Sequence, residues 1–197
     1  MAKIVILITF AFLLGSVPVG AVIAKFKSID LRKVGSGNIG ATNVLRAMGR
    51  GPAIITLIGD ILKGTISLVI ARHFLHNLTM EGIVGLAAVL GHNFSVFLRF
   101  RGGKGVATSI GVLLAYAPKA AVVTILIWLA VVFVTKYSSL GAIVSFGFLP
   151  LSVYILAHST EKLVVSVLMA TLLIVRHSAN IGRLIRGTES KIGAKAT

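Results

Sequence analysis

The chain contains no cysteine, and only 5 of its 197 residues are Asp or Glu. The lack of cysteine excludes disulfides, thiolate metal sites, iron–sulfur clusters and a thioester intermediate on the protein. The few carboxylates are scattered along the chain, so we expect neither a metal site nor a cofactor. Charged residues make up only 13% of the sequence, which is about half the usual share of a soluble domain.

Apolar residues are present in excess, at 56% of the chain, with a mean hydropathy of +0.99. A fold of this size cannot bury so much apolar sequence, because small folds keep a large surface-to-volume ratio. The net charge of +15 would suggest a nucleic-acid partner for a soluble domain, but the hydropathy excludes a soluble nucleic-acid binder. We therefore predict an all-α membrane protein that forms a single domain over residues 1–197.

Seven apolar runs predict membrane-spanning helices. The first gives 21 uncharged positions, enough at about 1.5 Å per residue to cross roughly 30 Å of hydrocarbon; a cleaved signal peptide is the alternative for this run. The fourth run is short, and Pro118 predicts a break after it, although a single span over residues 106–134 is the alternative. The runs are residues 4–24, 53–71, 82–98, 106–117, 120–134, 140–157 and 163–175.

The distribution of basic residues favours seven spans, because Lys and Arg prefer cytoplasmic loops. With seven spans, fifteen of the 20 basic residues lie on one side and four on the other, and Lys63 lies inside a span. We therefore expect a polytopic bundle of seven transmembrane helices, with the N-terminus outside and the C-terminus in the cytoplasm. Three polar segments then share the cytoplasmic face.

The first polar segment, residues 35–43, combines glycines with short polar side chains and is followed by Arg46. Its glycines permit close approach and positive φ, so the segment predicts a cradle for an anion, with a plain polar loop and helix cap as the alternative. Ser36 is a candidate catalytic residue. The candidate substrate-binding residues are Gly37, Asn38, Gly40, Thr42, Asn43 and Arg46.

The second polar segment, residues 91–108, surrounds Lys104 with three glycines directly before a helix. Free backbone N–H groups, the helix dipole and an ammonium can converge there on one phosphate. Helical spacing would place His92, Ser95 and Arg99 on one polar face, although interfacial anchoring is the alternative for Arg99 and Arg101. The candidate substrate-binding residues are His92, Ser95, Arg101, Gly102, Gly103, Lys104, Gly105 and Thr108.

The third polar segment, residues 176–189, places His177 and Asn180 three positions apart, on one helical face. Both are candidate catalytic residues, and Arg183 is a candidate substrate-binding residue. Glu189 is acidic in a basic tail, so we predict a structural role in pairing with neighbouring arginines.

Two charged residues lie inside the second span. Asp60 and Lys63 are spaced as an i,i+3 pair, and ionisable groups within a membrane usually face a polar cavity or one another. We count Asp60 as structural and Lys63 as a candidate substrate-binding residue; a structural ion pair between helices is the alternative.

The three segments resemble the motifs of the bacterial acyl-phosphate:glycerol-3-phosphate acyltransferases, integral membrane enzymes that begin phospholipid synthesis. The resemblance is carried, in order, by GSGNIGATNVLR, GHNFSVFLRFRGGKGVAT and RHSANIGRLIRGTE. It implies transfer of a fatty acyl group from acyl phosphate to the 1-hydroxyl of glycerol 3-phosphate, giving 1-acylglycerol 3-phosphate (lysophosphatidic acid) and inorganic phosphate. It also implies a place among the lipids of the bacterial inner membrane, an active site facing the cytoplasm, and an upstream enzyme that forms acyl phosphate.

The residues favour direct transfer over a covalent acyl-enzyme. Acyl phosphate has a good leaving group, so positioning and charge stabilisation can supply much of the rate, and no base is visibly paired with Ser36. None of the five histidines on the chain begins an HxxxxD motif. The hydroxyl proton would go to His177 or to a substrate phosphate. A transporter for an organic phosphate and a non-catalytic lipid-binding scaffold are the alternative functions.

Overall fold

The computed structural model describes residues 1–193, and the regular elements within that range are all helices, with no strand. The apolar runs form helices because a bilayer offers no water to pair with backbone N–H and C=O groups. The helices are α1 (Ala2–Ser16), α2 (Val19–Phe26), α3 (Ala41–Met48), α4 (Arg50–Leu75), α5 (Leu78–Asn93), the short 3₁₀ helix η1 (Val96–Leu98), α6 (Val106–Tyr116), α7 (Pro118–Thr135), α8 (Ser138–Gly147), α9 (Leu149–Ala157), α10 (Thr160–Arg176) and α11 (Ser178–Ile185).

The number of spans differs from the prediction. Within residues 1–193, four helical segments are long and apolar enough to cross a membrane, and two bent helix pairs raise the number to at most six. The all-α membrane fold is confirmed, whereas the seven spans and the orientation of the termini are not. The shortfall lies in α6, because its 11 residues extend only about 16 Å.

Proline shapes three of the apolar runs. The first run is interrupted at Val17 and Pro18, between α1 and α2. The predicted break at Pro118 is confirmed, since Pro118 occupies the first turn of α7, where its missing N–H has no helical partner to lose. Pro150, in the first turn of α9, lies at a bend of 42° between α8 and α9.

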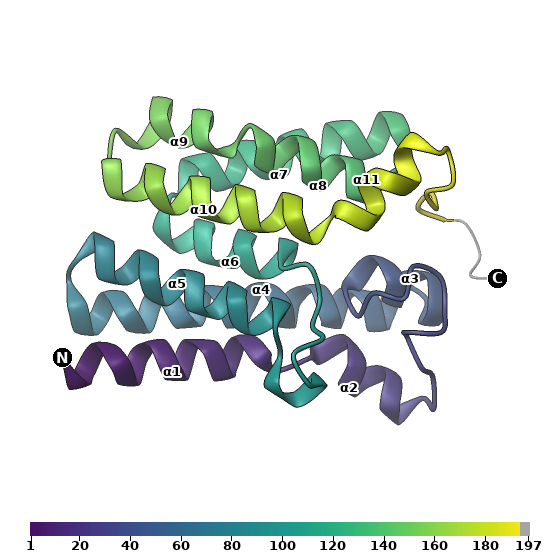
Figure 1. The fold of residues 1–197 in the computed structure, drawn as a ribbon, viewed down its shortest axis with the longest axis horizontal. Helices are drawn as coiled ribbons and strands as arrows, with labels where there is room; N and C mark the ends of the chain where they lie inside the picture. Colours follow the sequence, from purple (N-terminus) through teal and green to yellow (C-terminus); the bar gives the residue numbers. More distant parts are fainter. Residues whose placement is uncertain (194–197) are drawn as a thin grey trace.

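The helices form two groups that meet along α6 (Figure 1). Helices α1, α4 and α5 lie on one side of α6, and α7 to α10 lie on the other. Small residues allow the closest approaches, as is common between membrane helices. A Cβ at Gly15 of α1 would collide with the backbone of Ala88 in α5, and one at Gly64 of α4 would collide with the backbone of Thr108 in α6.

The polar segments gather toward one end of the bundle. Helix α3 lies beside the end of α4, and α10 bends by 57° into α11, so that α3 and α11 lie toward the same end of the molecule (Figure 1). The connection between α5 and α6 returns toward the middle of the bundle. This arrangement brings together segments that are far apart in the sequence.

Candidate active site

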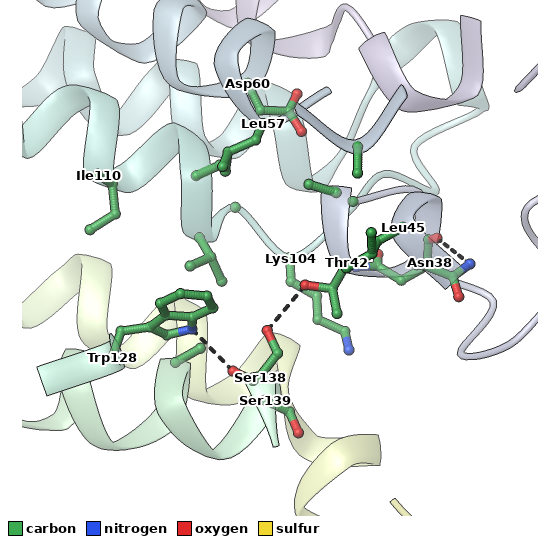
Figure 2. Close-up of a pocket in the computed structure, with 18 of the residues that line it drawn as sticks. Asn38, Thr42, Leu45, Leu57, Asp60, Lys104, Ile110, Trp128, Ser138 and Ser139 are labelled. Carbon is green, nitrogen blue, oxygen red and sulfur yellow. Dashed lines mark hydrogen bonds between the residues drawn. The ribbon is translucent and has the colours of Figure 1, made fainter. Parts of the chain in front are cut away.

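The three polar segments line one cavity of about 570 Å³. Ser36, Arg46 and Lys104 give it a polar end, whereas Leu57 and Trp128 belong to an apolar end. Figure 2 shows Leu57, Ile110 and Trp128 on one side of this space, and Asn38, Thr42 and Lys104 on the other. A cavity with these two ends is suited to a ligand that has an anionic head and an apolar chain.

The first polar segment is held in shape by the buried side chain of Asn43. Its amide oxygen accepts the Ser36 N–H at 2.9 Å. Its amide nitrogen donates to three carbonyls at 2.8 to 3.1 Å, those of Leu31, Val34 and Asn38. The segment can turn this tightly because Gly35 and Gly37 have φ of +57° and +67°, a region that glycine adopts without strain. Asn43 therefore holds the loop that presents Ser36 to the cavity.

Arg46 keeps guanidinium donors for a ligand. Its Nη2 donates to the Ser190 carbonyl at 2.9 Å, while its buried Nε has no hydrogen-bond partner among residues 1–193. Burial lowers the pKa of Arg46, Glu189 opposes this and Arg183 adds to it, but an arginine remains charged at any ordinary pH. A buried and unpaired donor on a cation that lines the cavity is suited to an anionic substrate.

The glycine-rich loop (residues 102–105) differs from the predicted cradle in one respect. The N–H groups of Gly102 and Gly103 already donate to the carbonyls of Asn93 and His92, at 3.2 and 3.0 Å. The expectation that they are free for a phosphate is therefore wrong. Free donors remain at the N-terminus of α6, where the first N–H groups have no intrahelical partner and where Gly105 and Val106 line the cavity.

Lys104 projects from this loop into the polar end of the cavity (Figure 2). Its ammonium donates to the amide oxygen of Asn180. Burial and the nearby Arg183 together lower the pKa of Lys104 to about 8, although Glu189 opposes them. A bound anionic group would raise this pKa again, because a nearby negative charge favours the protonated ammonium. Lys104 is therefore suited to bind an anion.

Arg176 holds the glycine-rich loop from the side of α10. Its guanidinium donates to the Gly103 carbonyl at 3.0 Å and to the Gly102 carbonyl at 3.4 Å, and it lies 5.3 Å from the centre of the Phe94 ring. Arg176 is the first residue of the third motif but is not among the predicted site residues.

Glu189 joins the third segment to α8. Its carboxylate accepts hydrogen bonds from Ser139 at 2.7 Å, Asn180 at 2.6 Å and Arg183 at 2.7 Å. Burial raises the pKa of Glu189, but the hydrogen bonds from these three side chains outweigh it and hold the pKa below its usual range. The predicted pairing with an arginine is present, whereas no motif marks Ser139 as part of the site.

His177 is buried where α10 meets α11, and it lines the cavity. Its Nδ1 lies 2.8 Å from the Leu173 carbonyl oxygen. A carbonyl can only accept, so this contact assigns the proton of a neutral ring to Nδ1 and leaves the lone pair on Nε2. His177 therefore has the tautomer that a proton acceptor needs.

The second span carries a buried ion pair, as its spacing suggests. Lys63 Nζ lies 2.9 Å from Asp60 Oδ1, and His92 Nδ1 lies 3.6 Å from the same oxygen. Asp60 and His92 line the cavity, but Lys63 does not. The fold thus brings a histidine and an aspartate together that form no HxxxxD motif in the sequence.

The predicted polar face through His92, Ser95 and Arg99 is wrong, because α5 ends at Asn93. The Ser95 hydroxyl instead donates to the Ser16 carbonyl at 2.5 Å, at the end of α1. More than half of the predicted site residues line the cavity: Ser36, Asn38, Gly40, Thr42, Asn43, Arg46, Asp60, His92, Lys104, Gly105, His177 and Glu189. The others do not line it: Gly37, Lys63, Ser95, Arg101, Gly102, Gly103, Thr108, Asn180 and Arg183.

The apolar end contains a residue that no motif marks. Trp128 of α7 lines the cavity, and its indole N–H donates to the Ser138 carbonyl at 3.3 Å. The Ser138 hydroxyl lies 3.1 Å from that of Thr42, so the apolar end is linked to the first polar segment (Figure 2). Tryptophan is common at membrane interfaces, so the residue type alone does not indicate that Trp128 belongs to the site.

Comparisons with known proteins agree on one family. A family model described as glycerol-3-phosphate acyltransferase matches residues 5–187. The glycerol-3-phosphate acyltransferase of Trichlorobacter lovleyi is 48% identical over 184 residues, covering 93% of this chain and 95% of the relative. A glycerol-3-phosphate acyltransferase of Thermus thermophilus is 47% identical over 186 residues, covering 94% of each chain.

Two crystal structures share the fold. Both are of PlsY (YgiH), an integral membrane glycerol 3-phosphate acyltransferase. The glycerol 3-phosphate form superposes with a TM-score of 0.93 at 41% identity, and the lysophosphatidic acid form with a TM-score of 0.90 at 40% identity. Each match covers 97% of this chain and 96% of the other.

Proposed function

The chain belongs to the glycerol-3-phosphate acyltransferase family, and we propose that its acyl donor is acyl phosphate. The fatty acyl group is transferred to the 1-hydroxyl of glycerol 3-phosphate, and the products are 1-acylglycerol 3-phosphate and inorganic phosphate. The observation that carries this proposal is the cavity that joins a cationic end to an apolar end. Both substrates present a phosphate to the cationic end, and the acyl chain occupies the apolar end.

The cationic end has enough donors for two phosphates. Lys104 and the first N–H groups of α6 hold one phosphate, because a helix N-terminus and an ammonium both attract anions. Arg46 holds the other through the guanidinium N–H groups that its contact with Ser190 leaves free. Ser36 orients the glycerol hydroxyl, while Asn180 positions Lys104 through its amide oxygen. The remaining proposed substrate contacts come from polar groups of the first segment that line the same wall, Asn38, Gly40 and Thr42.

The transfer needs no covalent nucleophile from the protein. The glycerol hydroxyl oxygen attacks the acyl carbonyl carbon, the bond between that carbon and the phosphate oxygen breaks, and phosphate leaves with the bonding electrons. No hydrogen bond links the Ser36 hydroxyl to a base among residues 1–193, whereas an attacking serine needs one. Mass spectrometry of the protein mixed with acyl phosphate alone should therefore show no acyl adduct, and an adduct at Ser36 would contradict direct transfer.

The proton of the glycerol hydroxyl has two possible acceptors, His177 Nε2 and an oxygen of a bound phosphate. The second suits a site with so few carboxylates. Replacing His177 with alanine separates them, because loss of a general base typically lowers turnover by 10²- to 10⁴-fold. Near-normal turnover of His177→Ala at saturating substrate would assign the proton to a phosphate oxygen.

A phosphate-release assay with purified protein in detergent tests the donor directly. We expect release only when acyl phosphate and glycerol 3-phosphate are both present. An acyl thioester in place of acyl phosphate, and glycerol in place of glycerol 3-phosphate, serve as the matched controls. Because a thioester releases no phosphate, that control is read as 1-acylglycerol 3-phosphate formed, and formation as fast as with acyl phosphate would refute the proposed donor. Turnover without a sealed membrane would also separate an enzyme from a transporter.

We further propose that the chain crosses the bacterial inner membrane seven times, with the active site at the cytoplasmic face. Counting the short helix α6 as a span gives seven, and the excess of basic residues on one side supports this orientation. Acyl phosphate would then arrive from an upstream enzyme at that face. A cysteine introduced at Lys119, in the first turn of α7, should react only with a reagent added from outside. Labelling from the cytoplasmic side would refute this topology.

A further inference from the structure

The proposed transfer does not use a network of buried ionisable side chains that lies beside the glycine-rich loop. Asp60 and Lys63 of α4 and His92 of α5 are each at most 5% exposed. Charged groups inside a membrane are unfavourable and are usually retained for a function. Because the network lies at the wall of the cavity, its role should concern the site.

Lys63 is engaged within the protein rather than with a ligand. Its ammonium pairs with Asp60 at 2.9 Å and donates to the Val17 carbonyl at 3.0 Å. That carbonyl lies at the break between α1 and α2. Lys63 therefore ties the break to α4 and fixes the position of the Asp60 carboxylate.

His92 connects this carboxylate to the glycine-rich loop. Its Nδ1 is buried, has no hydrogen-bond partner among residues 1–193, and lies 3.6 Å from Asp60 Oδ1. The opposite edge of the ring faces the loop, since a Cβ at Gly103 would collide with His92 Nε2. The His92 backbone also accepts the Gly103 N–H at 3.0 Å. The ring thus lies between Asp60 and the residue that precedes Lys104.

We propose that Asp60, Lys63 and His92 are positioning residues. Lys63 fixes the Asp60 carboxylate, and this carboxylate orients the His92 ring. The ring in turn sets the position of the glycine-rich loop, and hence of Lys104, relative to the cavity. This rests on the proposed function, in which Lys104 holds a phosphate. In this role the three residues act through the loop rather than by contact with substrate. Arg176 holds the carbonyls of the same loop from α10, so the loop is clamped between the two halves of the bundle.

The test compares steady-state constants for both substrates in His92→Ala, Gly103→Ala and Lys104→Gln. Lys104→Gln identifies the substrate whose phosphate the lysine holds. We expect His92→Ala and Gly103→Ala to raise the KM of that same substrate about tenfold, with kcat changed less than about threefold, because a misplaced loop weakens binding more than chemistry. A drop in kcat at unchanged KM would instead make His92 a proton-transfer group and overturn the proposal.

A double-mutant cycle tests the contact itself. Gly103→Ala should be harmful because its methyl group meets the His92 ring, so it should add little in the His92→Ala background. Asp60→Asn should likewise raise the same KM alone and add little to His92→Ala. Additive effects would refute the route from Asp60 through His92 to Gly103, since independent sites are additive.

The matched control is Thr65→Val on α4. It removes a hydrogen bond to the Gly111 carbonyl in α6, 2.8 Å long, without a contact to the loop, and both KM values should stay unchanged. If Asp60→Asn does not fold, His92→Ala and Gly103→Ala still decide the outcome. If Lys104→Gln itself leaves both KM values unchanged, the proposed phosphate role of Lys104 fails; if Lys104→Gln raises one and His92→Ala does not, only the positioning network fails.

Discussion

The lowered pKa of Lys104 predicts a sharp alkaline limit on substrate binding. Lys104 is a cation, so its contribution to phosphate binding is complete well below a pKa of about 8 and is lost as the pH rises through that value. With this pKa, the protonated fraction of the free enzyme falls from about nine-tenths at pH 7 to about one-tenth at pH 9. The value of kcat/KM for the substrate bound by Lys104 should therefore fall about tenfold between these two pH values.

The assay is phosphate release in detergent from pH 6.5 to 9.5, with each substrate varied in turn. The second ionisation of a phosphate monoester has a pKa of about 6. A fall in kcat/KM near pH 8 therefore comes from the titration of a protein group. Lys104→Arg is the matched variant, because an arginine keeps its charge across this range. Its activity should be lower but level between pH 7 and 9. If kcat/KM of Lys104→Arg falls between pH 7 and 9 as it does in the unchanged protein, Lys104 is not the titrating group.

Three further perturbations have defined outcomes. Glu189→Gln removes the charge that pairs with Arg183, so we expect a loss of about 2 kcal/mol of stability with a lower thermal midpoint in detergent; an unchanged midpoint would contradict the role of Glu189 as an organiser. Asn43→Ala removes four hydrogen bonds and should lower stability by about 3 kcal/mol and abolish activity, as seen in thermal shift and phosphate release. Trp128→Ala should raise the KM for a long-chain acyl phosphate several-fold while leaving that for glycerol 3-phosphate unchanged, and equal effects on both would show that Trp128 does not contact the acyl chain.

Features set by neighbouring residues could be predicted from the sequence. The break at Pro118 follows from the chemistry of proline, and the i,i+3 spacing of Asp60 and Lys63 predicts the ion pair that the structure contains. The three polar segments could also be identified, because they interrupt an otherwise apolar chain. Each of these inferences needs no knowledge of how distant helices pack.

Contacts between distant segments could not be predicted in the same way. Ser139 lies 50 positions from Glu189, and Arg176 lies 73 positions from Gly103. Such contacts depend on the rotation and depth of each helix, which apolar periodicity defines poorly when helices face lipid on one side and protein on the other. For the same reason, the expected free N–H groups in the glycine-rich loop are occupied by the end of α5.

The scarcity of carboxylates limits how the cationic end can be organised. Arg183 lowers the pKa of both Arg46 and Lys104, because like charges at this distance repel. Glu189 is the carboxylate that offsets them, yet its two oxygens are already occupied by Ser139, Asn180 and Arg183.

One carboxylate can hold such a cluster in place but cannot neutralise it, so a positive charge remains for the substrate. A second acid would form internal ion pairs at the expense of phosphate binding. We therefore expect acidic substitutions on the cavity wall, such as Thr42→Asp, to weaken both substrates far more than the isosteric Thr42→Val. Equal loss from the two variants would show that shape rather than net charge controls binding at this wall.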